Sequence, residues 1–185
     1  MIVSNVNVFW LADAVRASKY PMSVDVSKCT DEITPTVLRL MKAAPGTGHD
    51  QFLTGIVVQF DLTFSIKAWP EMQRYHFIDF VSSQSTMHRA AKFDVRRQCN
   101  EYVTENTIQE VKRHVERYNA SPTDENYLAL VYNLPTCFLL TARMTTNYRQ
   151  LKTIYKQRKL RRLPEWRRFC EWIETLPFAK EMIFE

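Results

Sequence analysis

Residues 56–66 of this 185-residue chain read Ile-Val-Val-Gln-Phe-Asp-Leu-Thr-Phe-Ser-Ile and decide its fold. From Phe60 onward, apolar and polar side chains alternate. Because successive side chains of a strand point to opposite faces of a sheet, this pattern predicts one buried face and one polar face. Such alternation is typical of antiparallel sheets, whereas strands of parallel sheets are apolar throughout. We therefore expect a half-buried antiparallel strand within residues 52–66.

Further strands and several helices are predicted on either side of this segment. Residues 1–10 alternate as an opening strand that places Val6, Val8 and Trp10 on one face, and the apolar run at 137–142 has the length of another strand. Capping residues and helical spacing predict helices over residues 30–44, 70–77, 104–118, 123–134, 147–159 and 164–176. The stretch Pro45-Gly46-Thr47-Gly48 is expected to end the first of them. An antiparallel sheet with packed helices defines an α+β fold class.

Length and composition describe a folded chain without linkers. With 185 residues the chain is long enough for one core and short for two, so we expect a single domain over residues 1–185. Only three glycines are present, and no Gly/Ser tract interrupts the chain. No apolar run is long enough to cross a membrane, and the alternating N-terminus does not read as a signal peptide. We expect a cytoplasmic protein with no membrane partner.

The cysteines and histidines do not have the spacing of a metal site. The four cysteines are widely separated, at positions 29, 99, 137 and 170, and the four histidines lack a pattern such as His-Glu-x-x-His. We therefore expect no metal centre and reduced thiols.

Positive charge is concentrated late in the chain. The formal net charge is +5, and residues 156–168 hold seven lysines and arginines with Glu165 as their one acid. Three interpretations fit this basic run: phosphate recognition, contact with nucleic acid, and a helix face exposed to solvent. The solvent-exposed face is the commonest of the three. A nucleic-acid module could also use Trp166 and Trp172 for stacking. Because both tryptophans fit the apolar stripe of a helix or its edge, we regard a nucleic-acid partner as unfavoured.

A second informative stretch runs from Arg74 to Arg89. Its first part is aromatic and carries His76, and its second part, from Ser82 to Thr86, holds hydroxyl and amide side chains. These groups can orient a ligand by hydrogen bonds near neutral pH. Serine clusters are also typical of turns and helix caps. Taken alone, the stretch favours an ordinary turn with a packed histidine.

Set beside other polar landmarks, this stretch resembles the flavin-dependent thymidylate synthase family. The family signature is Arg-His-Arg, seven further residues and a serine that usually follows glutamine. Here His76, flanked by Tyr75 and Phe77, is followed at the same interval by Gln84 and Ser85. The histidine, the glutamine, the serine and the interval are kept, whereas both arginines are replaced.

Other family landmarks occur in the same order, from about residue 48 to residue 166. A Gly-His-acid triplet is matched at 48–50, which includes His49, and a Leu-Pro pair is matched at 134–135. An Asn-x-Arg helix start is matched by Asn147 and Arg149, and an arginine eleven residues after the asparagine by Arg158. A Glu-Trp pair at 165–166 completes the series. Each match is short, and the resemblance rests on their collinearity.

The departures from the family concern cationic positions. Where the family has arginines, this chain has Tyr75, Phe77, Met87 and Val131. Bidentate contacts from arginine to phosphate are among the stronger polar interactions of a site. The charge is therefore supplied from shifted positions, or the pocket holds a different ligand. The candidates for shifted charge are Arg74, Arg89, Arg143 and Arg149.

The resemblance implies a cofactor, a reaction and a set of site residues. FAD would accept a hydride from NADPH, and a one-carbon unit would pass from methylenetetrahydrofolate to C5 of a dUMP-like pyrimidine nucleotide. The implied FAD-binding residues are His49, His76, Asn147 and Arg149. The implied nucleotide-binding residues are Gln84, Ser85, Arg89 and Arg158. Of these, Arg158 would stabilise negative charge on the pyrimidine and Ser85 is the second catalytic candidate, with no need to be a nucleophile.

The resemblance also implies a homotetramer with sites shared between subunits. Because four cationic positions are lost, an alternative is a catalytically inactive protein that keeps the fold and holds a nucleotide in a remodelled pocket. Whether the chain is an enzyme therefore stays open at the level of sequence. The plainest alternative, an α+β domain without a small-molecule site, requires the collinear matches to be accidental.

Overall fold

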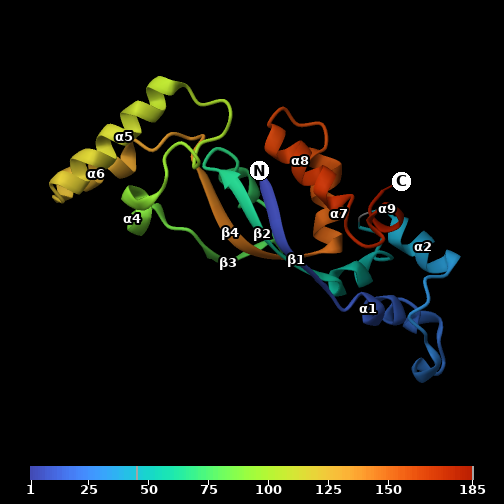
Figure 1. Ribbon diagram of the computed structural model, residues 1–185. Coiled ribbons are helices and arrows are strands. Elements are labelled where there is room, and N and C mark those ends of the chain that lie inside the picture. Colours follow the sequence, from blue (N-terminus) through green and yellow to red (C-terminus); the bar gives the residue numbers. More distant parts are fainter. Residues whose placement is uncertain (45, 185) are drawn as a thin grey trace.

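The computed structural model describes residues 1–44 and 46–184. Within these residues, four strands form one antiparallel sheet in the order β1-β2-β4-β3 (Figure 1). The strands are β1 (Ile2–Phe9), β2 (Val57–Ser65), β3 (Asp79–Ser83) and β4 (Leu139–Asn147). The predicted α+β class with an antiparallel sheet is confirmed.

The centre of the sheet is the pair formed by β2 and β4. Every residue of one strand has a partner in the other, with Phe60 opposite Met144. The side chains of β2 alternate as the sequence predicts. Its buried apolar residues are Val58, Phe60, Leu62 and Phe64, and the partly exposed polar residues between them are Gln59, Asp61 and Thr63.

Two C-terminal helices, α7 (Tyr148–Arg158) and α8 (Pro164–Ile173), cover the buried face of the sheet (Figure 1). The Phe64 ring lies edge-on to Trp166 with centroids 5.3 Å apart, and Phe60 lies 5.9 Å from Phe169. Aromatic pairs of this kind contribute roughly 0.5–1.5 kcal/mol beyond the area that they bury. The predicted apolar stripe of α8 is therefore core.

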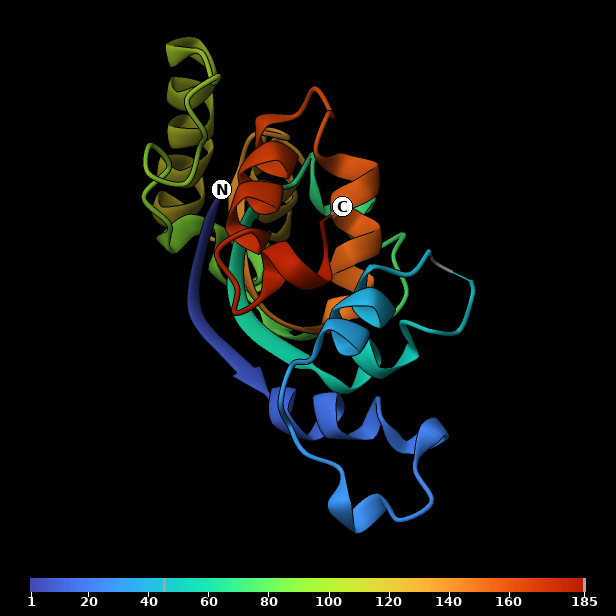
Figure 2. The same cartoon turned by 90° about the vertical axis from the view of Figure 1, so that its right-hand side faces the viewer.

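The remaining helices lie at the two ends of the sheet. At one end are α1 (Leu11–Ala17), α2 (Pro35–Lys42) and α9 (Ala179–Met182); at the other, α5 (Glu105–Ala120) and α6 (Asp124–Tyr132) form a hairpin that stands apart from the sheet (Figures 1 and 2). This hairpin has a small apolar cluster of its own that includes Ile108 and Val111. Single turns, α3 (Trp69–Met72) and α4 (Thr86–Arg89), flank β3, and short 3-10 segments span Tyr20–Met22, Val26–Lys28, Gln51–Gly55 and Ala90–Lys92.

Several predicted helices are shorter than expected, and the one predicted over 164–176 ends at Ile173. The helix predicted over 30–44 begins at Pro35, because Thr34 is the residue whose hydroxyl accepts the hydrogen bond of the Val37 amide and Pro35 suits the first helical position. Pro45, predicted to help end it, lies outside the described residues. The helix predicted over 70–77 ends at Met72.

The strand predictions also need correction at their ends. The predicted strand at 137–142 begins at Leu139 and continues to Asn147, although its later part is polar, because it pairs with β2 on one side and β3 on the other. Residues 79–83, read as part of a turn, form the edge strand β3. Trp10 leaves the opening strand with φ at +60° and is exposed.

Asp50 is the centre of a buried group of charges that joins three segments. Its carboxylate accepts hydrogen bonds from Arg149 Nε and Lys152 Nζ, each at 3.2 Å, and its side chain is fully buried. Lys152 Nζ also donates to the carbonyls of Met41 and Ala43, both at 2.7 Å, at the C-terminal end of α2. Burial lowers the pKa of Lys152, and the contacts with Asp50 oppose that shift.

We expect Asp50→Asn to lower the free energy of unfolding by about 2–3 kcal/mol, because it leaves the buried Lys152 cation without a counter-charge. Asp61→Asn is the matched control, since Asp61 pairs with Arg143 at 3.3 Å where both side chains are a quarter exposed. That change should cost about 1 kcal/mol or less. Urea unfolding of both variants measures the difference. Equal losses would contradict a special role for Asp50.

Candidate functional site

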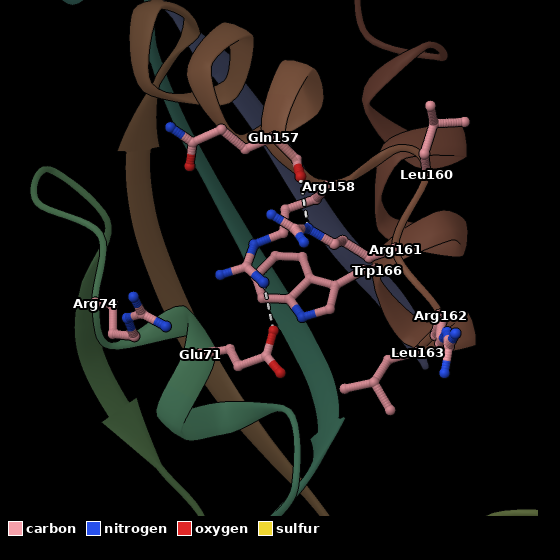
Figure 3. Close-up of a pocket in the computed structure, with 9 residues that line it drawn as sticks. All are labelled: Glu71, Arg74, Gln157, Arg158, Leu160, Arg161, Arg162, Leu163 and Trp166. Carbon is pink, nitrogen blue, oxygen red and sulfur yellow. Dashed lines mark hydrogen bonds and ion pairs between the residues drawn. The ribbon is translucent and has the colours of Figure 1, made fainter.

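Arg158 lines a surface pocket of about 640 Å³ between α3, the end of α7 and the start of α8 (Figure 3). We call it the Arg158 pocket. Its volume lies within the range of small-molecule sites. The residues that line it are Glu71, Arg74, Gln157, Arg158, Leu160, Arg161, Arg162, Leu163 and Trp166.

The guanidinium of Arg158 is held from several sides by side chains of this chain. Nη1 forms an ion pair with the Glu71 carboxylate, and Nε donates to the Tyr75 hydroxyl at 2.6 Å. The guanidinium carbon also lies 4.5 Å from the centre of the Trp166 ring. Stacking of this kind adds a cation–π attraction to the hydrogen bonds. Arg158 is therefore neutralised and fixed in direction.

Tyr75 stands where the family has the first arginine of its signature, and it contacts Arg158. Its ring lies 5.2 Å from the guanidinium carbon, and its hydroxyl also donates to Gln157 Oε1 at 3.1 Å. An arginine at this position would place a second cation against Arg158. Tyr75 instead gives Arg158 a stacked and hydrogen-bonded support.

Asn147 and Arg149 lie together in a second pocket of about 440 Å³, at the start of α7. We call it the Asn147 pocket. Arg149 is oriented by two hydrogen bonds, from Nε to Asp50 at 3.2 Å and from Nη1 to Gln51 Oε1 at 2.8 Å. The residues that line the pocket are Gln51, Thr54, Phe77, Asn147, Arg149, Gln150 and Thr153.

Phe77, in the place of the second family arginine, also lines the Asn147 pocket. Its side chain is 71% exposed, and its backbone has φ at +60°, a conformation that side chains adopt at a cost. The Thr146 hydroxyl donates to its carbonyl at 2.7 Å and holds the turn in place. An exposed aromatic ring is thus presented to a pocket that otherwise offers hydrogen-bonding groups.

The two predicted histidines are exposed and lie outside these pocket linings. His49 is in the loop that ends at the buried Asp50, and His76 precedes Phe77, with the two rings 6.5 Å apart. Neither histidine lines the Asn147 pocket, but His76 is the neighbour in sequence of Phe77, which does, and His49 lies two residues before Gln51, which also does.

The motif residues Gln84 and Ser85 are engaged in local structure. Gln84 extends the pairing of β3 with β4, because its amide N donates to the Thr141 carbonyl and its Oε1 accepts from the Thr141 amide, both at 2.9 Å. The Ser85 hydroxyl accepts from the His88 amide at 3.3 Å and caps α4, the turn that Arg89 ends. Gln84 also lines a third pocket of about 350 Å³, walled by Trp69 and other residues of α3, β3 and β4.

The structure thus brings Asn147 and Arg149 together but separates the four predicted nucleotide-binding residues. Arg158 lies in one pocket and Gln84 in another, whereas Ser85 and Arg89 belong to α4. Of the arginines considered as substitutes, Arg74 lines the Arg158 pocket, Arg149 lines the Asn147 pocket, and Arg143 pairs with Asp61 at 3.3 Å.

Several residues of the Arg158 pocket were not predicted as site residues. Trp166 is predicted as part of an apolar helix stripe, while Arg161 and Arg162 belong to the basic run that the sequence leaves open between three interpretations. The concentration of charge at 156–168 was the available signal. Nothing in the sequence placed Glu71 opposite that run.

The described residues hold no group of three or more His, Cys, Asp or Glu side chains placed to bind a metal ion. All four cysteines, which lie within the described ranges, are free thiols. Among the helices of residues 1–44 and 46–184, none is long and apolar enough to cross a membrane.

Comparison with known proteins identifies the fold. No protein-family model and no curated protein matches this sequence. Among solved structures, however, the chain has the fold of the flavin-dependent thymidylate synthases over its whole length. Two crystal structures that match are of ThyX from Helicobacter pylori with FAD and dUMP. They are 15% and 16% identical to this chain, with TM-scores of 0.77 and 0.79, and the match covers 100% of this chain and 98% of theirs.

The fold expected from the resemblance is confirmed by these structures, and the low identity agrees with a divergent sequence. At 15–16% identity the likeness establishes the fold. The roles of individual residues remain predictions.

Asn147 has a structural role, and a test of ligand binding by Asn147 must distinguish that role from any effect on the ligand. Its Oδ1 accepts from the Gln150 amide at 2.9 Å and caps α7. We expect Asn147→Ala to lower the free energy of unfolding by about 1 kcal/mol and Asn147→Asp, which keeps the cap, by less. Urea unfolding of both variants checks this. An alanine variant as stable as the parent would show that the cap contributes nothing.

Proposed function

We propose that the chain is a divergent flavin-dependent thymidylate synthase-like protein that binds FAD and a pyrimidine nucleotide. The observation that carries the proposal is the match of fold over the full chain to ThyX structures with FAD and dUMP. The placement of Asn147 and Arg149 in one pocket and of Arg158 in another supports it, since the resemblance assigns them to the cofactor and the nucleotide.

The Asn147 pocket has groups that suit a flavin. Its lining combines amide, hydroxyl and guanidinium groups, which can bond the polar edge of a ring system or a ribityl chain, with the exposed Phe77 ring, which can stack. Asp50 and Gln51 hold the Arg149 guanidinium in place before any ligand arrives. When bound, FAD would supply hydride transfer. The role of this chain is to bind and orient it.

Arg158 is the residue that we propose to face the pyrimidine. Preorganised donors stabilise charge that develops during a reaction, because they need no reorganisation at that moment. Tyr75, Trp166 and Glu71 fix the guanidinium in this way, while the carboxylate of Glu71 reduces its net charge. If the protein is active, the one-carbon donor and the reductant would be methylenetetrahydrofolate and NADPH, as the resemblance implies.

A second candidate is a nucleotide-binding protein without turnover on the same fold. The observation that favours it is the use of Ser85 as a helix cap and of Glu71 as a partner of Arg158, which leaves both catalytic candidates engaged within the chain. We further propose, on the resemblance, a single domain that assembles as a cytoplasmic homotetramer.

The absorbance spectrum of the freshly purified protein tests the proposal, together with mass spectrometry of whatever denaturation releases. A yellow protein that releases FAD and a pyrimidine nucleotide would support it. NADPH oxidation in the presence of dUMP and methylenetetrahydrofolate separates the enzyme from the inactive binder. A colourless protein whose melting temperature FAD does not raise would overturn the flavin assignment.

We expect Phe77→Arg to tighten FAD binding by about tenfold, because it restores a cation at the edge of the Asn147 pocket where the family has one. Titration of the apoprotein with FAD measures this. Arg74→Ala, which changes charge in the other pocket, is the control and should leave FAD affinity within about twofold. Weaker FAD binding by Phe77→Arg would mean that the aromatic ring itself holds the ligand.

A further inference from the structure

Trp166 carries a buried hydrogen-bond donor without an acceptor. The residue is fully buried, and its Nε1 has no partner among the described residues. Leaving a buried N–H unpaired costs free energy, so such a group is rare unless something else satisfies it. Trp166 lines the Arg158 pocket, and in Figure 3 the nitrogen edge of the indole faces the side formed by Glu71 and Leu163. The position points to a ligand atom that accepts a hydrogen bond.

The charge of the same pocket points to an anion. Four arginines and one glutamate line it, which gives a net charge of +3. Glu71 pairs with Arg158, whereas within the described residues no acid pairs with Arg74, Arg161 or Arg162, which are exposed. Three guanidinium groups without an acidic partner among the described residues thus line the cavity, and guanidinium is well suited to phosphate.

The turn that carries two of these arginines is fixed to its neighbours. Arg167 Nη1 donates to the carbonyls of Arg161 at 2.9 Å and Arg162 at 2.7 Å. The Arg161 amide donates to the Arg158 carbonyl at 3.0 Å, and its Nε to the Gln157 carbonyl at 3.0 Å. Arg167 therefore holds the backbone of this turn in place, and it acts as a positioning residue for Arg161 and Arg162. A merely solvated basic surface needs no such support.

We propose that the Arg158 pocket takes a nucleotide with more than one phosphate, whose phosphate chain contacts Arg74, Arg161 and Arg162 while another oxygen accepts from Trp166 Nε1. This inference rests on the proposed function, because it takes the nucleotide to lie at Arg158. A phosphate monoester carries a charge of about −1.5 to −2 at pH 7, and each further phosphate adds about one more, so a di- or triphosphate matches three free cations better than a monophosphate does.

The test is binding of dUMP, dUDP, dUTP and inorganic tripolyphosphate to the full chain by calorimetry at fixed ionic strength. We expect dUTP to bind about tenfold or more tightly than dUMP, because each added phosphate gains charge-assisted hydrogen bonds. The double variant R161A/R162A should lose this preference. The matched control is R96A/R97A, another adjacent pair of exposed arginines, which pair with Glu105 and Asp94 away from the pocket.

Trp166→Phe tests the unpaired donor separately. It keeps an aromatic ring and removes the N–H, so we expect weaker dUTP binding by about threefold to tenfold at a temperature where circular dichroism shows the variant to be folded. Unchanged dUTP affinity in folded Trp166→Phe would overturn the assignment of a ligand acceptor at Nε1.

The remaining outcomes separate this inference from the proposed function. Equal affinities for dUMP and dUTP, or equal losses in R161A/R162A and R96A/R97A, would overturn the polyphosphate inference while dUMP binding still supports the nucleotide site. Absence of flavin together with absence of any nucleotide binding would overturn both. Tighter binding of a short single-stranded oligonucleotide than of dUTP would overturn the inference in favour of a nucleic-acid surface.

Discussion

The architecture around the Asn147 pocket depends on one buried carboxylate. Asp50 lies in the loop after α2 and receives Lys152 and Arg149 from the first turns of α7. Through Lys152 the same group reaches the carbonyl groups at the end of α2. A buried charge is tolerated only when its partners are close and its hydrogen bonds are satisfied. The loop supplies the carboxylate, α7 supplies the two cations, and the end of α2 supplies carbonyl acceptors. The pocket-lining guanidinium is therefore oriented by the interaction that joins the loop, α2 and α7.

In the Arg158 pocket, the main constraint is to hold one arginine in place with the side chains around it. Tyr75 supplies a ring that stacks on Arg158 and a hydroxyl that accepts from it. Glu71 supplies the counter-charge. The other arginines of the pocket are Arg74 and two in the turn before α8, labelled Arg161 and Arg162 in Figure 3. The positive charge of the pocket therefore comes from Arg74, Arg161 and Arg162 as well as from Arg158.

The sequence predicted the elements whose signals are local. The alternation of residues 56–66 identified the central strand, and Thr104, Thr123 and Asn147 marked the starts of three helices, because their side chains cap the first turn. It did not predict β3, whose exposed residues carry no apolar pattern and which is a strand because β4 pairs with it. The resemblance named Asn147, Arg149 and Arg158 as site residues, and in the structure all three line pockets. Glu71 was not predicted as a site residue. Its ion pair with Arg158 joins residues 87 positions apart in the chain, and no local sequence pattern indicates such a contact.

The pairing of the sheet has a consequence for how the chain folds. The central strand β2 ends at Ser65, and β4, its partner along its whole length, begins at Leu139. The helices that cover the buried face of β2 come later still. Contacts so distant in sequence are formed slowly, because the loop between them must close first. During synthesis, the apolar face of β1 and β2 therefore stays exposed until the last third of the chain has left the ribosome. The α5–α6 hairpin, with its own small core, can form earlier.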